Sequence, residues 1–222
     1  MKELKEIRFW IFDLDNTLYP PTTNLFSKID KLMCEFIKKN LKVSYEKALN
    51  IKNTYFHKHG TTLNGLMKNH NIDAEKFLEF VHDIDYSHLK KDIELGEEIR
   101  KLPGEKIIFT NGSRKHAQRV TKQLGIEKNF DKIFDIVDSK YIPKPQVDPY
   151  YDLISTYQIK TKNSIFFEDI VKNLLTAHKL GMKTAWIEND DSYCKEGYDG
   201  KHIDYKVKNL KVFLKQINKN IN

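Results

Sequence analysis

The sequence predicts an α/β fold, in which a doubly wound parallel sheet carries an inserted all-helical lobe after its first strand. Short apolar runs rich in β-branched and aromatic residues are typical of buried parallel strands, and after Thr110 they alternate with amphipathic stretches typical of helices. Between the first two runs, roughly ninety residues show helical periodicity alone, which is far more than a crossover between neighbouring strands needs.

We expect five strands in chain order, at Ile7–Phe12, Lys106–Thr110, Ile133–Val137, Ser164–Glu168 and Thr184–Glu188. The amphipathic stretches after the second strand predict helices at Arg114–Leu124, Pro149–Tyr157, Lys172–Leu180 and near Leu210–Ile217. The insertion predicts helices at Leu25–Leu41, Tyr45–His59, Leu63–His70 and Ala74–Leu89. Asp73 is the expected N-cap of the last of these. We therefore expect a core domain of residues 1–20 and 98–222 and a cap domain of residues 21–97.

Composition narrows the functional class. The chain has 222 residues and a formal net charge of +7, with 40% hydrophobic and 31% charged residues, which is typical of a folded globular protein and not of a disordered, collagen-like or coiled-coil chain. The basic residues are scattered and form no nucleic-acid module, so we expect a small anionic partner rather than a nucleic acid polymer.

The N-terminal apolar run is broken by Arg8 and is too short for a signal peptide or a membrane span. Cys34 and Cys194 lack the close spacing of a redox or zinc motif. We therefore expect a cytoplasmic protein that does not contact a membrane, whose oligomeric state the sequence does not predict.

Polar residues follow four of the expected strands. Because ligands bind beyond the carboxyl ends of strands in an open α/β sheet, these residues are the candidates for chemistry. Asp13 and Asp15 follow the first strand, and two residues apart in an extended chain they point to the same side. Residues 110–113, with the sequence Thr-Asn-Gly-Ser, open onto a helix N-terminus and form a natural anion cradle.

The other two strand ends carry opposite charges. Lys144 lies between Pro143 and Pro145, which restrict the loop and make this lysine a positioned cation. Glu168 and Asp169 follow the fourth strand, where carboxylate oxygens could bind a hard divalent cation. Each feature alone is ordinary loop chemistry, but all four at one edge of one sheet indicate an active site.

In this order, the motifs Asp13-x-Asp15-x-Thr17, Thr110-Asn111, Lys144 and Glu168-Asp169 resemble those of the haloacid dehalogenase superfamily of phosphohydrolases. The helical insertion is similar to the cap of the first subclass of that superfamily. Longer runs resemble its pyrimidine 5′-nucleotidase branch, namely residues 12–20, 59–66, 82–86, 109–113 and 166–174.

The resemblance implies hydrolysis of a small phosphate monoester, most simply a pyrimidine nucleoside 5′-monophosphate, through an aspartyl-phosphate intermediate. Asp13 would attack phosphorus, and Asp15 would protonate the leaving alcohol and then take a proton from water. Lys144 would add positive charge, and Mg²⁺ would be held by Asp13, the backbone carbonyl of Asp15 and Asp169.

The remaining roles that the resemblance implies are supporting ones. Thr110 and the amides of Asn111 and Gly112 would bind the phosphate oxygens, and Thr17 would fix the first loop by a hydrogen bond. Glu168 would be a second choice as metal ligand.

The cap residues are less specific. Thr61, Thr62 and Asn64 could contact the leaving group or form a helix N-cap turn. The cap histidines His57, His59, His82 and His88 are expected to be surface or partly buried residues rather than ligands. Arg114 and His116 could touch substrate or lie on the exposed side of the first turn of their helix.

Several alternatives stay open. Sugar-phosphate or pyridoxal-phosphate phosphatases and phosphomutases share the same motifs, whereas Asp15 disfavours a true haloacid dehalogenase, since that class lacks this acid. A phospho-acceptor signalling domain would not carry a long insertion after its first strand. An inactive regulatory protein is disfavoured because every motif position is filled.

Overall fold

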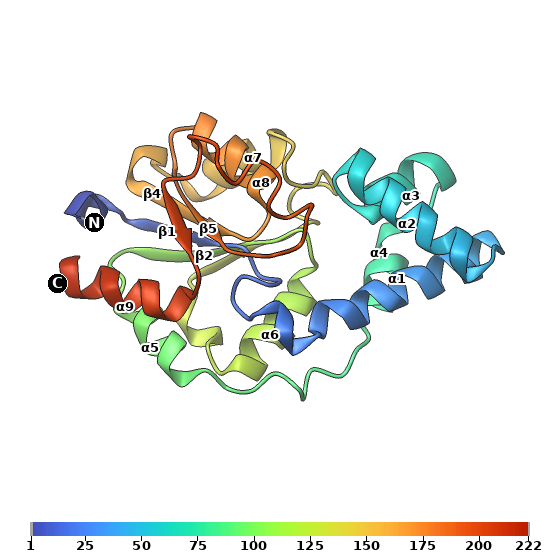
Figure 1. Cartoon of the computed structure of the whole chain (residues 1–222), viewed down its shortest axis with the longest axis horizontal. Coiled ribbons are helices and arrows are strands. Elements are labelled where there is room, and N and C mark those ends of the chain that lie inside the picture. The colour runs from blue at the N-terminus through green and yellow to red at the C-terminus, as the bar shows by residue number, and fades with distance from the viewer. Residues whose placement is uncertain (1, 222) are drawn as a thin grey trace.

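Six parallel strands with helices on both faces make up the sheet domain in the computed structural model, which describes residues 2–221 (Figure 1). The strands are Phe9–Phe12 (β1), Glu105–Phe109 (β2), Lys132–Phe134 (β3), Ser164–Glu168 (β4), Lys183–Ile187 (β5) and Tyr205–Val207 (β6). They are ordered β3-β2-β1-β4-β5-β6, and every neighbouring pair is parallel. The predicted doubly wound α/β fold is confirmed.

The α-helices are Leu25–Leu41 (α1), Tyr45–His59 (α2), Thr62–His70 (α3), Ala74–Val81 (α4), Ile93–Arg100 (α5), Arg114–Leu124 (α6), Asp148–Tyr157 (α7), Val171–Lys179 (α8) and Leu210–Ile221 (α9). Several begin after a short polar side chain that accepts a hydrogen bond from the first turn of backbone amides, namely Ser44, Thr61, Asp73, Asp92 and Ser113. The predicted N-cap role of Asp73 is confirmed.

Successive side chains along each strand are buried on opposite faces of the sheet, as the two-residue period of a strand requires. Trp10 and Phe12 pack with apolar residues of α5, α6 and α9, whereas Ile11 packs with those of α7 and α8. The rings of Phe12 and Phe167 stack with their centroids 4.7 Å apart across β1 and β4. Figure 1 shows α5, α6 and α9 on one side of the sheet and α7 and α8 on the other.

Helices α1–α4 form a lobe beside the sheet, at the end of the molecule away from both termini (Figure 1). They have an apolar cluster of their own, which includes Phe36, Leu66 and Phe77. Leu95 and Ile99 of α5 instead pack into the cluster beneath the sheet. The expected boundary between residues 97 and 98 falls inside α5 and stays a prediction, and this packing favours an earlier one.

Two predicted elements end earlier than expected. The helix expected over Ala74–Leu89 stops at Val81, because His82 turns toward α6, where its Nδ1 lies 3.0 Å from Ser113 Oγ. The strand expected over Ile133–Val137 stops at Phe134, because the carboxylate of Asp135 accepts hydrogen bonds from the backbone amides of Val137 and Asp138 and folds the chain into a turn.

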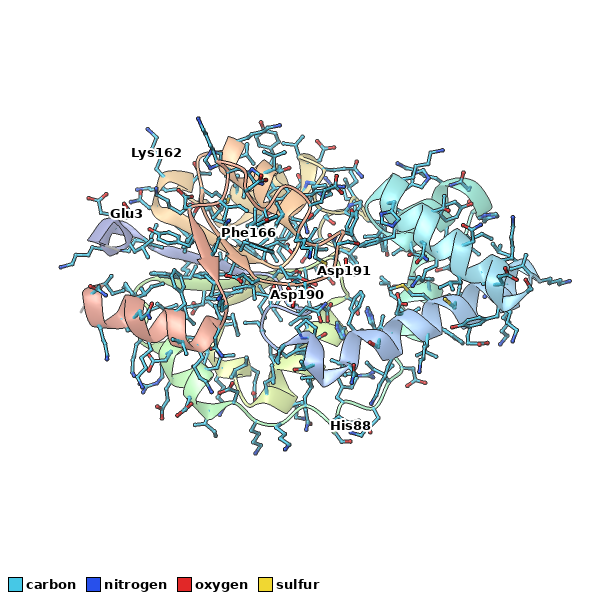
Figure 2. All side chains as sticks on the ribbon, in the orientation of Figure 1. Glu3, His88, Lys162, Phe166, Asp190 and Asp191 are labelled. Atoms are coloured by element: carbon cyan, nitrogen blue, oxygen red, sulfur yellow. The ribbon has the colours of Figure 1, made fainter. Side chains whose placement is uncertain are left out.

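Two elements have no range among those expected. Helix α5, eight residues long, lies within the stretch of helical periodicity between the first two strands. Strand β6 has three residues and lies at the edge of the sheet, with only Val207 buried. Figure 2 shows the contrast between interior and surface, with Phe166 inside the sheet domain and Glu3, Lys162 and His88 at its outer rim. No helix in residues 2–221 combines the length and the apolar character needed to cross a membrane.

Helix α9 provides a direct test of the core on this face of the sheet. Leu214 is 0% exposed within the sheet cluster, whereas Val212 on the same helix is 52% exposed. Leu214→Ala should lower the free energy of unfolding by about 2–5 kcal/mol, because it removes buried methyl groups and leaves a cavity. Urea denaturation at constant m-value measures this loss. Val212→Ala should change stability by less than about 0.5 kcal/mol, and an equal loss in both variants would contradict the packing described here.

Candidate active site

The candidate site lies where the strand order reverses. The chain moves outward from β1 to β2 and β3 and then returns, so that β1 lies between β2 and β4. The carboxyl ends of neighbouring strands at such a reversal form the crevice in which α/β proteins bind ligands. Phe12 pairs with Phe167 in the register of β1 and β4, so Asp13 and Glu168 leave the sheet side by side.

Lys144 holds three of these strand ends together. Its side chain is 1% exposed, and its Nζ donates hydrogen bonds to Asp13 Oδ1 at 2.7 Å, to the Phe109 carbonyl at 2.9 Å and to Glu168 Oε2 at 2.7 Å. These acceptors use all three hydrogens of the ammonium group. The side chain of Asn111 fixes the lysine's backbone, since its Oδ1 accepts from the Lys144 amide at 2.9 Å.

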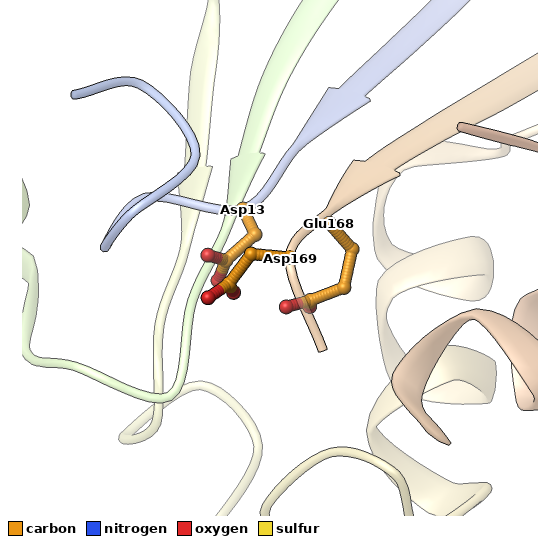
Figure 3. Close-up of side chains that lie close together, drawn as sticks. All are labelled: Asp13, Glu168 and Asp169. Atoms are coloured by element: carbon orange, nitrogen blue, oxygen red, sulfur yellow. The ribbon is translucent and has the colours of Figure 1, made fainter. Parts of the chain in front are cut away.

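Three carboxylates gather at the same place (Figure 3). One oxygen each of Asp13, Glu168 and Asp169 lies within 4.8 Å of the others, and all three residues are buried. Asp169 is oriented by Asn189, whose Nδ2 donates to Asp169 Oδ2 at 2.8 Å. The structure therefore brings together the carboxylates of two predicted metal ligands, Asp13 and Asp169, with Glu168 beside them.

This cluster carries an excess of negative charge, because it has three carboxylates and is paired with the ammonium group of Lys144. Burial, followed by the charge of Glu168, raises the pKa of Asp13 to about 7 despite the contact with Lys144. Burial and the charges of Glu168 and Asp13 likewise raise the pKa of Asp169 well above its usual range. Buried oxygen ligands with excess negative charge suit a hard divalent cation.

Asp15 lies in different surroundings. Its Oδ1 is 2.8 Å from His116 Nε2 and also accepts a hydrogen bond from the Tyr19 hydroxyl. Burial by itself would raise the pKa of Asp15, but the charge of His116 and the hydrogen bonds from His116 and Tyr19 outweigh it and hold this pKa below its usual value. Asn16 follows with a φ of 60°, a left-handed conformation that asparagine tolerates and that turns the chain out of β1.

The loop after β2 lies under Asp15. A Cβ atom on Gly112 would stand 3.7 Å from Asp15 Oδ2, so this carboxylate oxygen lies over the loop. Thr110 Oγ1 accepts a hydrogen bond from the Gly112 amide at 2.9 Å. Two of the predicted phosphate-binding groups, this hydroxyl and this amide, are therefore hydrogen-bonded to each other. Thr17 is buried nearby, but its hydroxyl has no hydrogen-bond partner in the described part of the chain, so the hydrogen bond expected of it is not seen.

The polar side chains of the predicted cap residues form hydrogen bonds to the backbone of the cap. Thr61 Oγ1 accepts from the Asn64 amide, Thr62 Oγ1 donates to the Lys52 carbonyl, and Asn64 Nδ2 donates to the His59 carbonyl. Thr61 is thus the N-cap of α3. Thr61 and Thr62 line the cavity described next, whereas Asn64 does not. A contact of these residues with substrate stays a prediction.

A cavity of about 730 Å³ joins the lobe to the strand ends. Its core side includes Asp13, Asp15, Thr110, Lys144 and Asp169. Its cap side includes Phe26, Met33, Tyr45, Lys52 and Phe56. Lys52 is buried and paired with Asp30, which also lines the cavity. The size and mixed lining suit a small polar molecule with an apolar or aromatic part.

Three side chains near Asp15 have contacts that the sequence did not predict, and His82 and His116 are buried rather than exposed. The rings of His82 and His116 stack with centroids 4.3 Å apart and planes 7° apart, and Tyr86 places its hydroxyl 2.9 Å from His116 Nδ1. Burial, with the charge of His116, lowers the pKa of His82 to about 3, so His82 is neutral near pH 7. The feature of the sequence that points to His116 as a site residue is its position in the first turn of the helix that follows the candidate phosphate loop.

Known proteins share features with this chain. "Phosphate metabolism protein 8" of Saccharomyces cerevisiae is 30% identical over 195 residues, which are 79% of this chain and 60% of the yeast protein. The chain thus spans about 60% of the length of this relative. A HAD phosphatase from Thermococcus onnurineus has a similar fold, with a TM-score of 0.63 at 18% identity over 95% of this chain and 98% of that one. An L-2-haloacid dehalogenase from Xanthobacter autotrophicus also has a similar fold, with a TM-score of 0.57 at 14% identity over 95% of this chain and 98% of that one.

The shared fold does not separate phosphatases from dehalogenases, since both occur among these neighbours. The sequence model of one family, described as haloacid dehalogenase-like hydrolase, matches residues 10–187 and so includes all four strand-end motifs. The chain belongs to the haloacid dehalogenase-like hydrolase family.

Proposed function

We propose that this hydrolase is a magnesium-dependent phosphatase for small phosphate monoesters, with pyrimidine nucleoside 5′-monophosphates as the expected substrates. One observation carries the proposal. Two carboxylates two residues apart line one cavity in different surroundings, Asp13 against Lys144 and the acidic cluster and Asp15 against His116 and Tyr19. A nucleophile and a separate acid are the pair that phosphate ester hydrolysis through a covalent intermediate requires.

In the first step, an oxygen of Asp13 forms a bond to phosphorus while the bond from phosphorus to the ester oxygen breaks, and Asp15 gives its proton to the leaving alcohol. In the second step, water attacks phosphorus, Asp15 takes a proton from that water, and the bond between phosphorus and Asp13 breaks. The products are the alcohol and inorganic phosphate, with both carboxylates restored. Thr110 and the amides of Asn111 and Gly112 support the transferring oxygens, with the Gly112 amide exchanging its bond to Thr110 Oγ1 for one to the phosphate.

The protonation states needed for this reaction depend on the bound groups. Asp13 has to be ionised to attack, although its pKa is raised in the ligand-free protein, and Asp15 has to carry a proton, although its pKa is lowered. A divalent cation beside Asp13 favours its ionised form, and a phosphate dianion beside Asp15 favours the protonated form of that acid. Both shifts therefore have the sign that the first step needs.

The residues fit Mg²⁺. Asp13 and Asp169 are buried carboxylates whose pKa values are raised by burial and then by the charge of Glu168, and Lys144 is paired with Asp13 and Glu168. Asp13, Asp169 and the Asp15 backbone carbonyl would hold the ion, with Glu168 occupied by Lys144. When bound, the ion offsets the charge of the phosphate and orients it toward the nucleophile.

The nucleotide part of the proposal rests on the motif resemblance and on the cap side of the cavity. Phe26, Phe56 and Tyr193 are aromatic lining residues, and the rings of Phe56 and Tyr193 lie 4.6 Å apart. Aromatic faces suit a planar base, and Lys52 with Asp30 offers a donor and an acceptor for its polar edge. The name of the yeast relative, "Phosphate metabolism protein 8", agrees with a function in phosphate metabolism.

The first test is phosphate release from UMP, CMP, sugar phosphates and pyridoxal phosphate, with Mg²⁺ or with EDTA. We expect Mg²⁺-dependent release that is strongest with UMP and CMP. Asp13→Asn should lower kcat by roughly a thousandfold or more, because the amide cannot act as the nucleophile. Acid-quenched wild-type protein should carry a phosphoryl group on the peptide that contains Asp13, as read by mass spectrometry.

The matched control is Asp190→Asn, which changes an exposed aspartate outside the cavity lining and should keep wild-type activity. Preference for sugar phosphates or pyridoxal phosphate would keep the phosphatase and overturn the nucleotide assignment. Isomerisation of a sugar phosphate without release of phosphate would indicate a mutase instead. No reaction with any ester would overturn the proposed function.

The second test measures metal binding without activity. At a Mg²⁺ concentration about 100 times its Kd, binding to the folded state adds about 2.7 kcal/mol of stability. For a chain of this size, that gain corresponds to a rise in Tm of roughly 5–10 °C in calorimetry. Asp169→Asn should abolish the rise. An equal rise in this variant would place the ion elsewhere.

A further inference from the structure

His116 makes a direct contact with the candidate acid although it lies on a helix and not at a strand end. It is 0% exposed, and its Nε2 lies 2.8 Å from Asp15 Oδ1. Because an ionised carboxylate only accepts hydrogen bonds, Nε2 is the donor in this contact. Ser113 caps α6 and accepts a hydrogen bond from the His116 amide at 3.3 Å, which fixes the histidine backbone relative to the phosphate loop.

The imidazole is also held on its other sides. Its Nδ1 faces the Tyr86 hydroxyl at 2.9 Å, and the ring of His82 is stacked on it. A Cβ on Gly112 would approach the ring at 3.2 Å, so the imidazole packs closely on the loop after β2. Tyr86 and His82 belong to the segment that connects the lobe to α5. The ring therefore has contacts from three segments that lie far apart in the sequence.

The contact leaves one oxygen of Asp15 available. In the described part of the chain, both hydrogen bonds to this carboxylate meet at Oδ1, from His116 and from Tyr19, whereas Oδ2 lies over Gly112. Tyr19 belongs to the same loop as Asp15 and is buried in the sheet cluster, so it fixes Asp15 within that loop. His116 is anchored on α6, which packs against the sheet, so it is the partner that fixes Asp15 relative to the phosphate loop.

We propose that His116 is a positioning residue for Asp15. It binds Oδ1 so that Oδ2 faces the reacting ester, and Tyr86 holds its ring in place. This inference rests on the proposed phosphatase function, in which Asp15 exchanges a proton with the leaving group. It implies that losing the contact slows phosphoryl transfer from an ester whose leaving group needs a proton more than transfer from an ester whose leaving group does not.

The test compares two conservative variants with two kinds of ester. The side-chain amide of His116→Gln can replace the Nε2 donor, whereas that of His116→Asn falls at the place of Nδ1 and cannot reach Asp15. One substrate is UMP, or the best alkyl ester of the panel, whose alkoxide leaving group needs a proton. The other is p-nitrophenyl phosphate, whose phenolate leaves without one. Both are assayed with Mg²⁺ for kcat and KM.

We expect His116→Asn to lower kcat/KM with the alkyl ester by roughly 100-fold, which is a typical contribution of general acid catalysis, because kcat/KM reports the transfer of the phosphoryl group to Asp13. Its kcat/KM with p-nitrophenyl phosphate should fall by no more than about 3-fold, because transfer from this ester gains little from the acid, whereas kcat also includes the water step that both esters share. His116→Gln should recover most of the loss with the alkyl ester. Tyr86→Phe should show the same selectivity with a smaller effect, and His88→Ala, an exposed histidine at the rim, should change neither rate.

A loss of kcat/KM that is equal for the two esters, or equal for the Asn and Gln variants, would show a structural role and overturn the inference. Thermal melting of each variant checks that it is folded at the assay temperature. Tyr86→Phe leaves His116 in place and gives the same comparison if both His116 variants unfold. Wild-type protein that releases phosphate from no ester would instead contradict the proposed function, and the inference would fall with it.

Discussion

The ammonium group of Lys144 is the interaction on which the rest of the site depends. It is removed from water and meets oxygens from the ends of β1, β2 and β4, through Asp13, the Phe109 carbonyl and Glu168. A buried cation is tolerated only when its charge is paired and each of its donors is satisfied. The three strand ends are thus tied to one point, and Asp13, the proposed nucleophile, takes its position from the sheet.

The same burial explains why the site favours cations. Asp13, Glu168 and Asp169 face one lysine, and low exposure to water strengthens their mutual repulsion. Burial itself raises the pKa values of Asp13 and Asp169, and the charge of Glu168 raises them further. Under the proposed function, a phosphate dianion entering this site meets net negative charge, which the proposed divalent cation would offset.

The strand-end residues could be predicted from the sequence, because buried strands have a clear apolar signal and parallel topology gathers their carboxyl ends at one edge. His82, Tyr86 and His116 could not be assigned. A histidine in the first turn of an amphipathic helix has no local signal that distinguishes a buried partner from an exposed residue. Its contact with Asp15 depends on how α6 and the segment after α4 pack around the loop after β1. Strand β6 was missed for a related reason, since a three-residue edge strand buries too little to show a period.

The two catalytic candidates show how position, and not residue type, assigns a role. Asp13 and Asp15 are the same amino acid two residues apart, yet one is surrounded by carboxylates and the other by an imidazole and a phenol. These surroundings shift their pKa values in opposite directions in the ligand-free protein. In the proposed reaction this separation has to be inverted, which a cation beside Asp13 and a phosphate dianion beside Asp15 would do. The residues that surround Asp13 lie at the strand ends of the sheet, whereas the surroundings of Asp15 include His116 of α6. His116 also contacts Tyr86 in the connection to the lobe. The contacts around the acid therefore extend to the segment that carries the lobe, whereas those of Lys144 around the nucleophile stay within the sheet domain.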